Sequence, residues 1–213
     1  MKHHRFYLLS LGLLTMLAFA SCKKEDTTKP NLSLNGSSTM NIDLGSSFTD
    51  PGATAVDETD GDISSSIGVT GSVDSSTVGT YTLTYTVSDK AGNVSITTRT
   101  VNVNMSRSAA LGAYHTTNNC PTPQSFVATA TNFQAGTNSN QFVINMFYYN
   151  GGTLTCTLDG TTVTVDPGQS PNPQLLPVTG SGTFNAQGKV LTMNYVFDPS
   201  GQNVSCTVVY THD

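Results

Sequence analysis

The stretch TYTLTYTV at residues 80–87 alternates Thr with Tyr, Leu or Val over its whole length. Successive side chains of a strand point to opposite faces, so this pattern predicts a strand with one apolar face and one hydroxyl face. The sequence DKAGN at 89–93 is typical of a turn, and VSITTRTVNV at 94–103 is expected to return as a second strand. We therefore expect a hairpin whose apolar face packs in the core of a β-sandwich.

The rest of the chain points to the same fold class. Short alternating runs and turn residues recur at intervals of roughly 8–12 residues around the hairpin. Only 11% of the 213 residues are charged, 19 are Gly, and no stretch has apolar residues at a convincing helical spacing. The length suits two domains of roughly 100 residues each. We expect an all-β protein.

The first block, 31–104, carries five motifs in order: LNG at 34–36, FTDPGA at 48–53, DETDGDI at 57–63, GTY at 79–81 and DKAGN at 89–93. Together they resemble the bacterial Ig-like domain found in a pesticidal crystal protein and in many surface proteins. The resemblance implies an Ig-like β-sandwich that serves as a spacer or adhesion module and not as a catalyst.

The second block, 111–213, follows a linker at 105–110 and is expected to form about eight strands. Asp159-Gly160 predicts a tight hairpin, and the segment 167–177 is rich in Pro and predicts a loop. Consecutive antiparallel strands suit either a small β-barrel or a two-sheet sandwich. This block resembles the C-terminal β-domains of unknown function in Bacteroidota Ig-like lipoproteins, which implies no activity. The expected strands are 111–117, 125–132, 141–149, 153–158, 161–166, 180–184, 190–197 and 203–210.

The N-terminus is expected to be a signal peptide over residues 1–21. Lys2 and Arg5 precede an apolar run that is too short to span a membrane, and small residues then lead to Cys22. This arrangement resembles a bacterial lipobox, although Phe19 stands where the pattern usually has an aliphatic residue. The resemblance implies cleavage before Cys22, lipid attachment at Cys22 and anchoring in the outer membrane. The alternative is an ordinary secretory signal with a chance Cys.

Residues 22–30 are expected to form a flexible tether, because they show no apolar periodicity. Within it, Lys24-Glu25-Asp26 resembles the surface-export signal of Bacteroidota lipoproteins. Asp26-Thr27-Thr28 resembles the O-glycosylation motif of that phylum, which would place a glycan on Thr27. The alternative is a solvated cluster of charges.

Three cysteines remain after Cys22. Cys120 follows the first strand of the second block and Cys206 lies in its last strand, and these strands are neighbours if the sheet closes. Cys156 alternates with Leu154 and Leu158, which favours a buried thiol. We therefore expect a Cys120–Cys206 disulfide, with Cys156–Cys206 as the alternative if two sheets pack face to face.

Sequence features of an enzyme are scarce. Outside the signal peptide the only histidines are His115 and His212, and no nucleophile elbow, zinc-protease motif or phosphate loop occurs. The net charge of −5 argues against nucleic acid as a partner. We expect no catalytic residues, no nucleic-acid binding and no cofactor other than a calcium ion.

The acidic loops of the first block are the candidate calcium site. Asp57, Asp60 and Asp62 are expected to converge in one loop, and Asp89 is placed to approach from another. Carboxylate oxygens in clustered loops suit Ca²⁺, which would relieve their mutual repulsion. The alternative is that these residues only shape tight turns.

Exposed aromatic rings are the candidates for ligand binding in the second block. Phe147-Tyr148-Tyr149 runs into Asn150-Gly151-Gly152, so alternation places at least one ring outward, and Tyr114 is a further candidate. The alternative is that these rings cap a core. The expected function is non-enzymatic binding or scaffolding at the cell surface, with a polysaccharide or a surface protein as partner. A purely structural or adhesive envelope module is the second reading.

Overall fold

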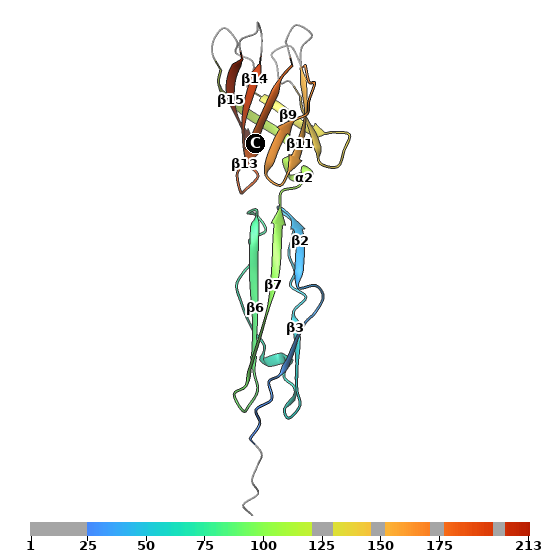
Figure 1. Ribbon diagram of the computed structural model, residues 1–213, viewed down its shortest axis with the longest axis vertical. Coiled ribbons are helices and arrows are strands. Elements are labelled where there is room, and N and C mark those ends of the chain that lie inside the picture. Colours follow the sequence, from blue (N-terminus) through green and yellow to red (C-terminus); the bar gives the residue numbers. More distant parts are fainter. Residues whose placement is uncertain (1–24, 121–129, 146–151, 171–176, 198–202) are drawn as a thin grey trace, which may run out of the picture.

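The computed structural model describes residues 25–120, 130–145, 152–170, 177–197 and 203–213. It is an elongated molecule with the first block at one end and the second block stacked on it end to end (Figure 1). Within the described residues, no helix is long and apolar enough to cross a membrane.

The first block has two sheets that face each other. One has the order β1-β3-β4 and the other β2-β7-β6-β5, with β2 parallel to β7. A short 3-10 turn, η1 (Ser64–Ser66), joins them. The strands are β1 (Asn31–Leu34), β2 (Thr39–Asp43), β3 (Ala53–Asp57), β4 (Gly61–Asp62), β5 (Gly68–Thr70), β6 (Gly79–Ser88) and β7 (Val94–Asn104).

The predicted hairpin is confirmed as β6 and β7, which pair antiparallel over their whole length. Leu83, Tyr85 and Val87 are buried on the inner face of β6, while the intervening Thr residues lie outward or at partial depth. Val101 and Val103 are buried on the facing part of β7. The hairpin is thus the central pair of the larger sheet.

The linker contains one turn of helix, α2 (Arg107–Ala110), which the sequence pattern did not predict. Ser106 caps it by accepting a hydrogen bond from the Ala109 backbone N–H. Met105 is buried on the barrel core, and Leu44 and Val78 of the first block pack against the same core. The Val78 N–H also donates to the Ala186 carbonyl at 2.7 Å, so the two blocks make a specific junction.

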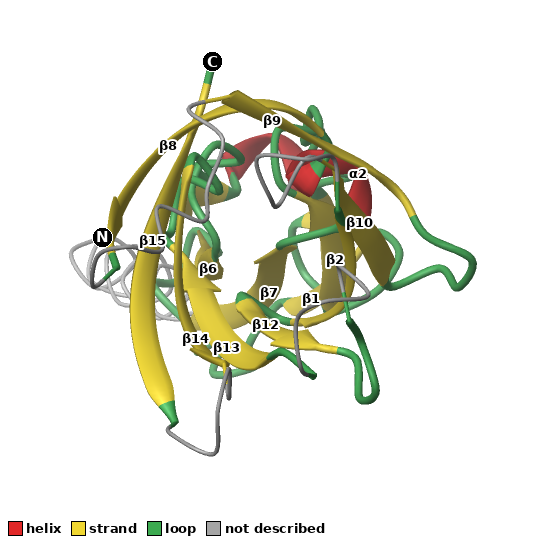
Figure 2. Cartoon of the chain, turned by 90° about the horizontal axis from the view of Figure 1, so that it is seen from above, coloured by secondary structure: helices red, strands yellow, loops and turns green. Residues whose placement is uncertain are grey.

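The second block is a closed barrel of eight antiparallel strands, each paired with its neighbours in sequence and the last with the first (Figure 2). The barrel expectation is confirmed, and the sandwich alternative is wrong because β8 pairs with β15 and β9 with β10. The strands are β8 (Gly112–Asn119), β9 (Ala130–Ala135), β10 (Gln141–Asn145), β11 (Thr153–Asp159), β12 (Thr162–Val165), β13 (Thr179–Phe184), β14 (Val190–Phe197) and β15 (Val204–His212).

Side chains fill the barrel interior along its described strands. Tyr114 stacks on Phe133 with ring centroids 4.0 Å apart, and Phe133 stacks on Phe142 at 5.0 Å. The hydroxyls of Tyr195 and Tyr210 hydrogen-bond to each other at 2.9 Å. Rings, aliphatic side chains and paired hydroxyls together make this interior a packed core.

The two ends of the barrel face in opposite directions along the molecule. The β13–β14 turn faces the first block, as its contacts with Val78 and Leu44 show. Because the strands alternate in direction, β8, β10, β12 and β14 end at the opposite, distal end, where β9, β11, β13 and β15 begin. This distal end lies farthest from the tether (Figure 1).

Candidate functional site

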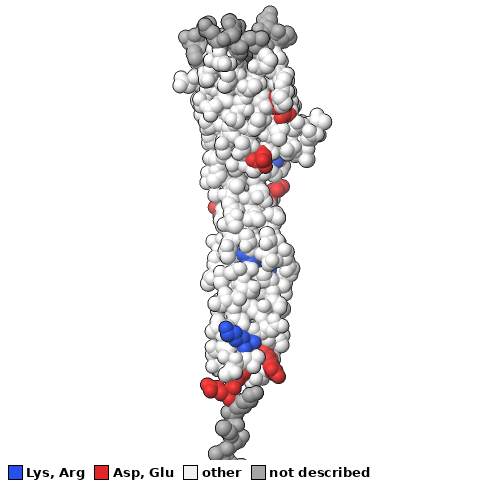
Figure 3. Space-filling model, viewed as in Figure 1, with Lys and Arg blue, Asp and Glu red and all other residues white. Residues whose placement is uncertain are grey.

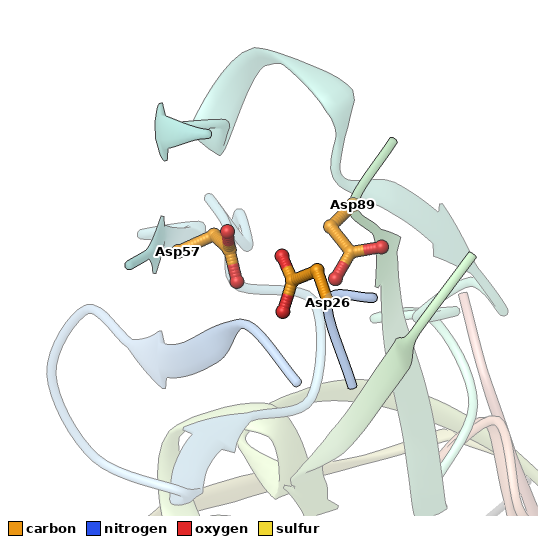
Figure 4. Close-up of side chains that lie close together, drawn as sticks. All are labelled: Asp26, Asp57 and Asp89. Carbon is orange, nitrogen blue, oxygen red and sulfur yellow. The ribbon is translucent and has the colours of Figure 1, made fainter. Parts of the chain in front are cut away.

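Acidic side chains gather at the end of the first block where the tether joins it, while most of the visible barrel surface carries no charge (Figure 3). Three elements meet there. Asp57 ends β3, Asp89 follows β6, and Asp26 lies in the tether just before β1. One carboxylate oxygen from each lies within 4.8 Å of the other two. We call these three residues the acidic triad (Figure 4).

Asp57 is the most buried member, with 2% of its surface exposed. Its Oδ1 accepts hydrogen bonds from the backbone N–H groups of Thr59 and Asp60, each at 2.9 Å, and so shapes the turn after β3. Its Oδ2 is buried and has no hydrogen-bond partner among the described residues. Figure 4 shows the Asp57 carboxylate directed toward Asp26 and Asp89.

Asp89 is held by the turn that it starts. Its Oδ1 accepts from the Asn93 backbone N–H at 2.8 Å and its Oδ2 from the Asn93 side-chain amide at 2.7 Å. Burial acts to raise the pKa of the Asp89 carboxyl, but hydrogen bonds from Asn93, Gly92 and Ala91 outweigh it and the pKa lies below its usual value. Asp89 is therefore ionised at neutral pH although it is 7% exposed.

Asp26 is fixed by contacts of the tether with the start of β7. The Asn93 side-chain amide donates to the Asp26 carbonyl at 3.1 Å, and the Ser95 hydroxyl donates to the Pro30 carbonyl at 2.5 Å. The Asp26 Oδ1 accepts from the Thr28 N–H at 3.0 Å. These hydrogen bonds hold residues 26–30 of the expected tether against the domain. Thr27 lies in this segment and is exposed.

Two of the four predicted calcium ligands lie outside the acidic triad. Asp60 binds Lys90 through a 2.9 Å ion pair and accepts the Lys90 N–H at 2.8 Å; both hydrogen bonds hold its pKa below the usual value. Asp62 accepts the Ser64 N–H at 2.9 Å, and its hydrogen bonds to Ser64 lower its pKa. The predicted convergence is thus wrong for Asp60 and Asp62. The sequence pattern missed Asp26 as a ligand, because Asp26 lies in the tether five residues before the first strand and outside the acidic loops.

A second buried polar group lies deeper in the first block. Arg99 on β7 is fully buried, and its guanidinium donates to the carbonyls of Asn35, Ser37 and Gly52 at 2.8–3.0 Å. Its Nε also donates to the Tyr85 hydroxyl at 3.1 Å and lies 3.3 Å from Asp50. Two of the family motifs, LNG at 34–36 and FTDPGA at 48–53, thus meet at one side chain. This network holds the fold together; its Arg99 side chain is fully buried, while the Asp50 side chain is 27% exposed.

The predicted aromatic candidates of the barrel do not form a described site. Tyr114 is fully buried and its hydroxyl donates to the Ala110 carbonyl at 2.8 Å, so the expectation of an outward ring is wrong there. The Tyr114 side chain points into the barrel because its position in β8 is one whose side chain faces the interior. Tyr148 and Tyr149 lie outside the described residues, as does Cys22. His115 is exposed and lies 2.9 Å from Asp213 at the chain end.

The expectations for Cys120, Cys156 and Cys206 are confirmed. Cys120 and Cys206 form a disulfide between the end of β8 and β15. Cys156 is a free thiol and fully buried, and burial raises its pKa well above the usual value.

Residues 32–103 match the family of Ig-like domains of bacterial surface proteins, which confirms the resemblance of the first block. No curated protein matches the chain.

Among solved structures, a lipoprotein from Bacteroides thetaiotaomicron is 16% identical with a TM-score of 0.36, and the match covers 86% of this chain and all of that one. The CBM51-2 and INT domains of ZmpB from Clostridium perfringens, in complex with GlcNAc, are 13% identical with a TM-score of 0.32, covering 86% of this chain and 44% of that one. A protein described as an outer membrane protein of Bacteroides fragilis is 12% identical with a TM-score of 0.32, covering 79% and 70%. Structural similarity this distant carries no argument about function.

Proposed function

We propose that this chain, whose residues 32–103 form an Ig-like domain of the bacterial surface type, is a non-enzymatic lipoprotein that displays a β-barrel away from the outer membrane. The observation that carries the proposal is the polarity of the molecule. The docked tether lies at one end of the Ig-like block, and the distal ends of the barrel strands lie at the opposite end of the molecule (Figure 1).

The tether geometry supports a role as a spacer. Asp26 is already docked on the domain, so only a few residues separate Cys22 from the acidic end of the block. Lipid chains on Cys22 would therefore hold that end close to the membrane, and several acyl chains anchor far more stably than one. The Ig-like block then raises the barrel outward by its own length.

A partner is expected to bind at the distal end of the barrel. The interior along the described strands is filled by buried side chains, so it offers no lumen for a ligand. Binding then falls to the distal end, where β10 ends and β11 begins. Tyr148 and Tyr149 stand in the sequence between these two strands. Tyrosine rings combine an apolar face with a hydroxyl, which suits the mixed surface of a sugar, and a polysaccharide is the partner that we propose first.

Membrane attachment is tested with Cys22→Ser. We expect the wild-type chain in the membrane fraction, labelled by radioactive palmitate and removed from intact cells by added protease. The variant should lose the label and leave the membrane fraction. Equal labelling and sedimentation of both would contradict lipid attachment at Cys22.

Glycan binding is tested by affinity electrophoresis of the full chain through gels that contain different polysaccharides. Retention that is lost in a Tyr148→Ala and Tyr149→Ala double variant, and kept in Gln187→Ala in the β13–β14 turn, supports binding at the distal end. If no polysaccharide retards the wild-type chain, the second candidate function, a structural or adhesive envelope module, is favoured instead.

A further inference from the structure

We propose that Asp26, Asp57 and Asp89 bind one calcium ion that fastens the tether to the base of the Ig-like block. The three residues come from the tether, from the end of β3 and from the turn after β6, so one ion there would join three separate elements (Figure 4). This site shares Asp57 and Asp89 with the loop site expected from the sequence, but its third ligand lies in the tether.

Asp57 has a buried carboxylate oxygen that a cation would satisfy. Its Oδ2 is buried without a hydrogen-bond partner in the described part of the chain and its carboxylate is directed toward the other two. A buried polar atom without a partner is costly, and it is rarer still for an anion. A cation between the three carboxylates would satisfy this oxygen.

The other carboxylate oxygens of Asp57 and Asp89 are already held in place by hydrogen bonds within their own turns. The Asp57 Oδ1 is occupied by two backbone N–H groups, and both oxygens of Asp89 are oriented by Asn93. The carboxylates are therefore fixed by their own turns and do not need an ion to place them. Carboxylates that accept hydrogen bonds and still lie together gain by sharing a cation, since it relieves their mutual repulsion.

The distances between the carboxylate oxygens of the acidic triad suit a shared Ca²⁺. Oxygens bound to one Ca²⁺ lie at about 2.4 Å from it, so two of them can be up to about 4.8 Å apart. The three ligand atoms lie within 4.8 Å of one another, a spacing at which small movements bring all of them to one ion. Asp26 is partly exposed and borders a surface hollow with Glu25 and Glu58, which leaves access for the ion and for water ligands.

The test uses the full chain in detergent, first stripped with a chelator. Titration calorimetry with CaCl₂ should show one ion per chain. About 10 mM Ca²⁺ should raise the melting temperature of the Ig-like block by about 5 °C over the chelated protein. Hydrogen exchange at the Thr28 amide, next to Asp26, should slow in Ca²⁺.

Three variants separate a metal site from turn chemistry. Asp57→Asn and Asp26→Asn keep an Oδ1 for the turn bonds but remove a charged ligand, so both should abolish calcium binding and the thermal shift. In chelator, Asp57→Asn should melt at or above the wild-type temperature, because one of three like charges is gone. Asp74→Asn is the matched control: its Oδ1 caps Ser76 in a similar turn outside the acidic triad, and it should bind Ca²⁺ like the wild type.

Two results would overturn the proposal. One is an absence of calorimetric binding together with an unchanged melting temperature in about 10 mM Ca²⁺. The other is a thermal shift that does not depend on the site: Ca²⁺ raises the melting temperature of Asp57→Asn as much as that of the wild type, or Mg²⁺ raises it equally in both proteins. Either shift would show general screening of an acidic surface.

Discussion

At the scale of single residues, the first block depends on a charged group in its core. Arg99 lies on the same inward face of β7 as Val101 and Val103, and the alternation of side chains along the strand predicts this from the sequence. Its acceptors cannot, because they lie in the β1–β2 loop, in β6 and in the segment before β3. The side chain therefore ties together segments that no local pattern connects.

Arg99→Met should destabilise the protein by about 3–5 kcal/mol, because it leaves three carbonyls and the Asp50 carboxylate without their buried donor. Chemical denaturation measures the loss. Lys90→Met is the control, since the Lys90 side chain is 85% exposed in its ion pair with Asp60 and its removal should change the unfolding free energy little. Equal losses in the two variants would show that the Arg99 network is not specifically stabilising.

Cys156 should be inert in the folded protein. The thiolate is the reactive form, and burial keeps the pKa of this thiol far above neutral, so the thiol stays protonated. In the Cys22→Ser background, where Cys156 is the only free thiol, a disulfide reagent should not react in native buffer at mildly alkaline pH. It should label one thiol in concentrated guanidinium chloride. Rapid labelling of the native protein would place Cys156 outside the barrel core.

At the scale of elements, the strands themselves could be read from the sequence and the barrel could not. The β6–β7 hairpin and the eight strands of the second block follow from period-2 alternation and from turn residues such as Asp159-Gly160. A sandwich and a barrel share that alternation, so it leaves both open. The pairings of β8 with β15 and of β9 with β10 close the sheet, and this closure makes the second block a barrel.

The disulfide reinforces this closure, because it joins the end of β8 to β15 across 86 residues. Replacing both cysteines, Cys120→Ser with Cys206→Ser, should cost about 4 kcal/mol by freeing the unfolded chain. The melting temperature of the oxidised protein should fall on addition of reductant, whereas that of the double variant should not respond. A reductant effect of the same size in the double variant would assign the loss to another cause.

At the scale of the whole molecule, the junction decides whether the two blocks act as one body. Met105 is 6% exposed on the barrel core, and Leu44 and Val78 reach the same core from the Ig-like block. The Val78–Ala186 hydrogen bond adds a fixed polar contact. The proposed display of the barrel at a set distance from the membrane would depend on this contact.

Met105→Ser should uncouple the blocks. We expect one calorimetric transition for the wild-type chain and two for the variant, with the barrel destabilised by about 2–4 kcal/mol through the lost apolar contacts. Val69→Ser is the control, because Val69 is 47% exposed in the first block. Two transitions in the wild-type chain would show that the blocks already unfold independently.

The sequence by itself determined the all-β class, the hairpin, the two blocks and the scarcity of catalytic groups. These follow from residue type, from alternation and from turn chemistry, which act over a few neighbouring residues. Only the tertiary structure decided which acidic residues meet, that Tyr114 points into the barrel, and that the tether is docked through Asn93 and Ser95. The reason is physical: sheet pairing and register bring together atoms from Asp26, Asp57 and Asp89, and no local pattern records which distant segments will pair.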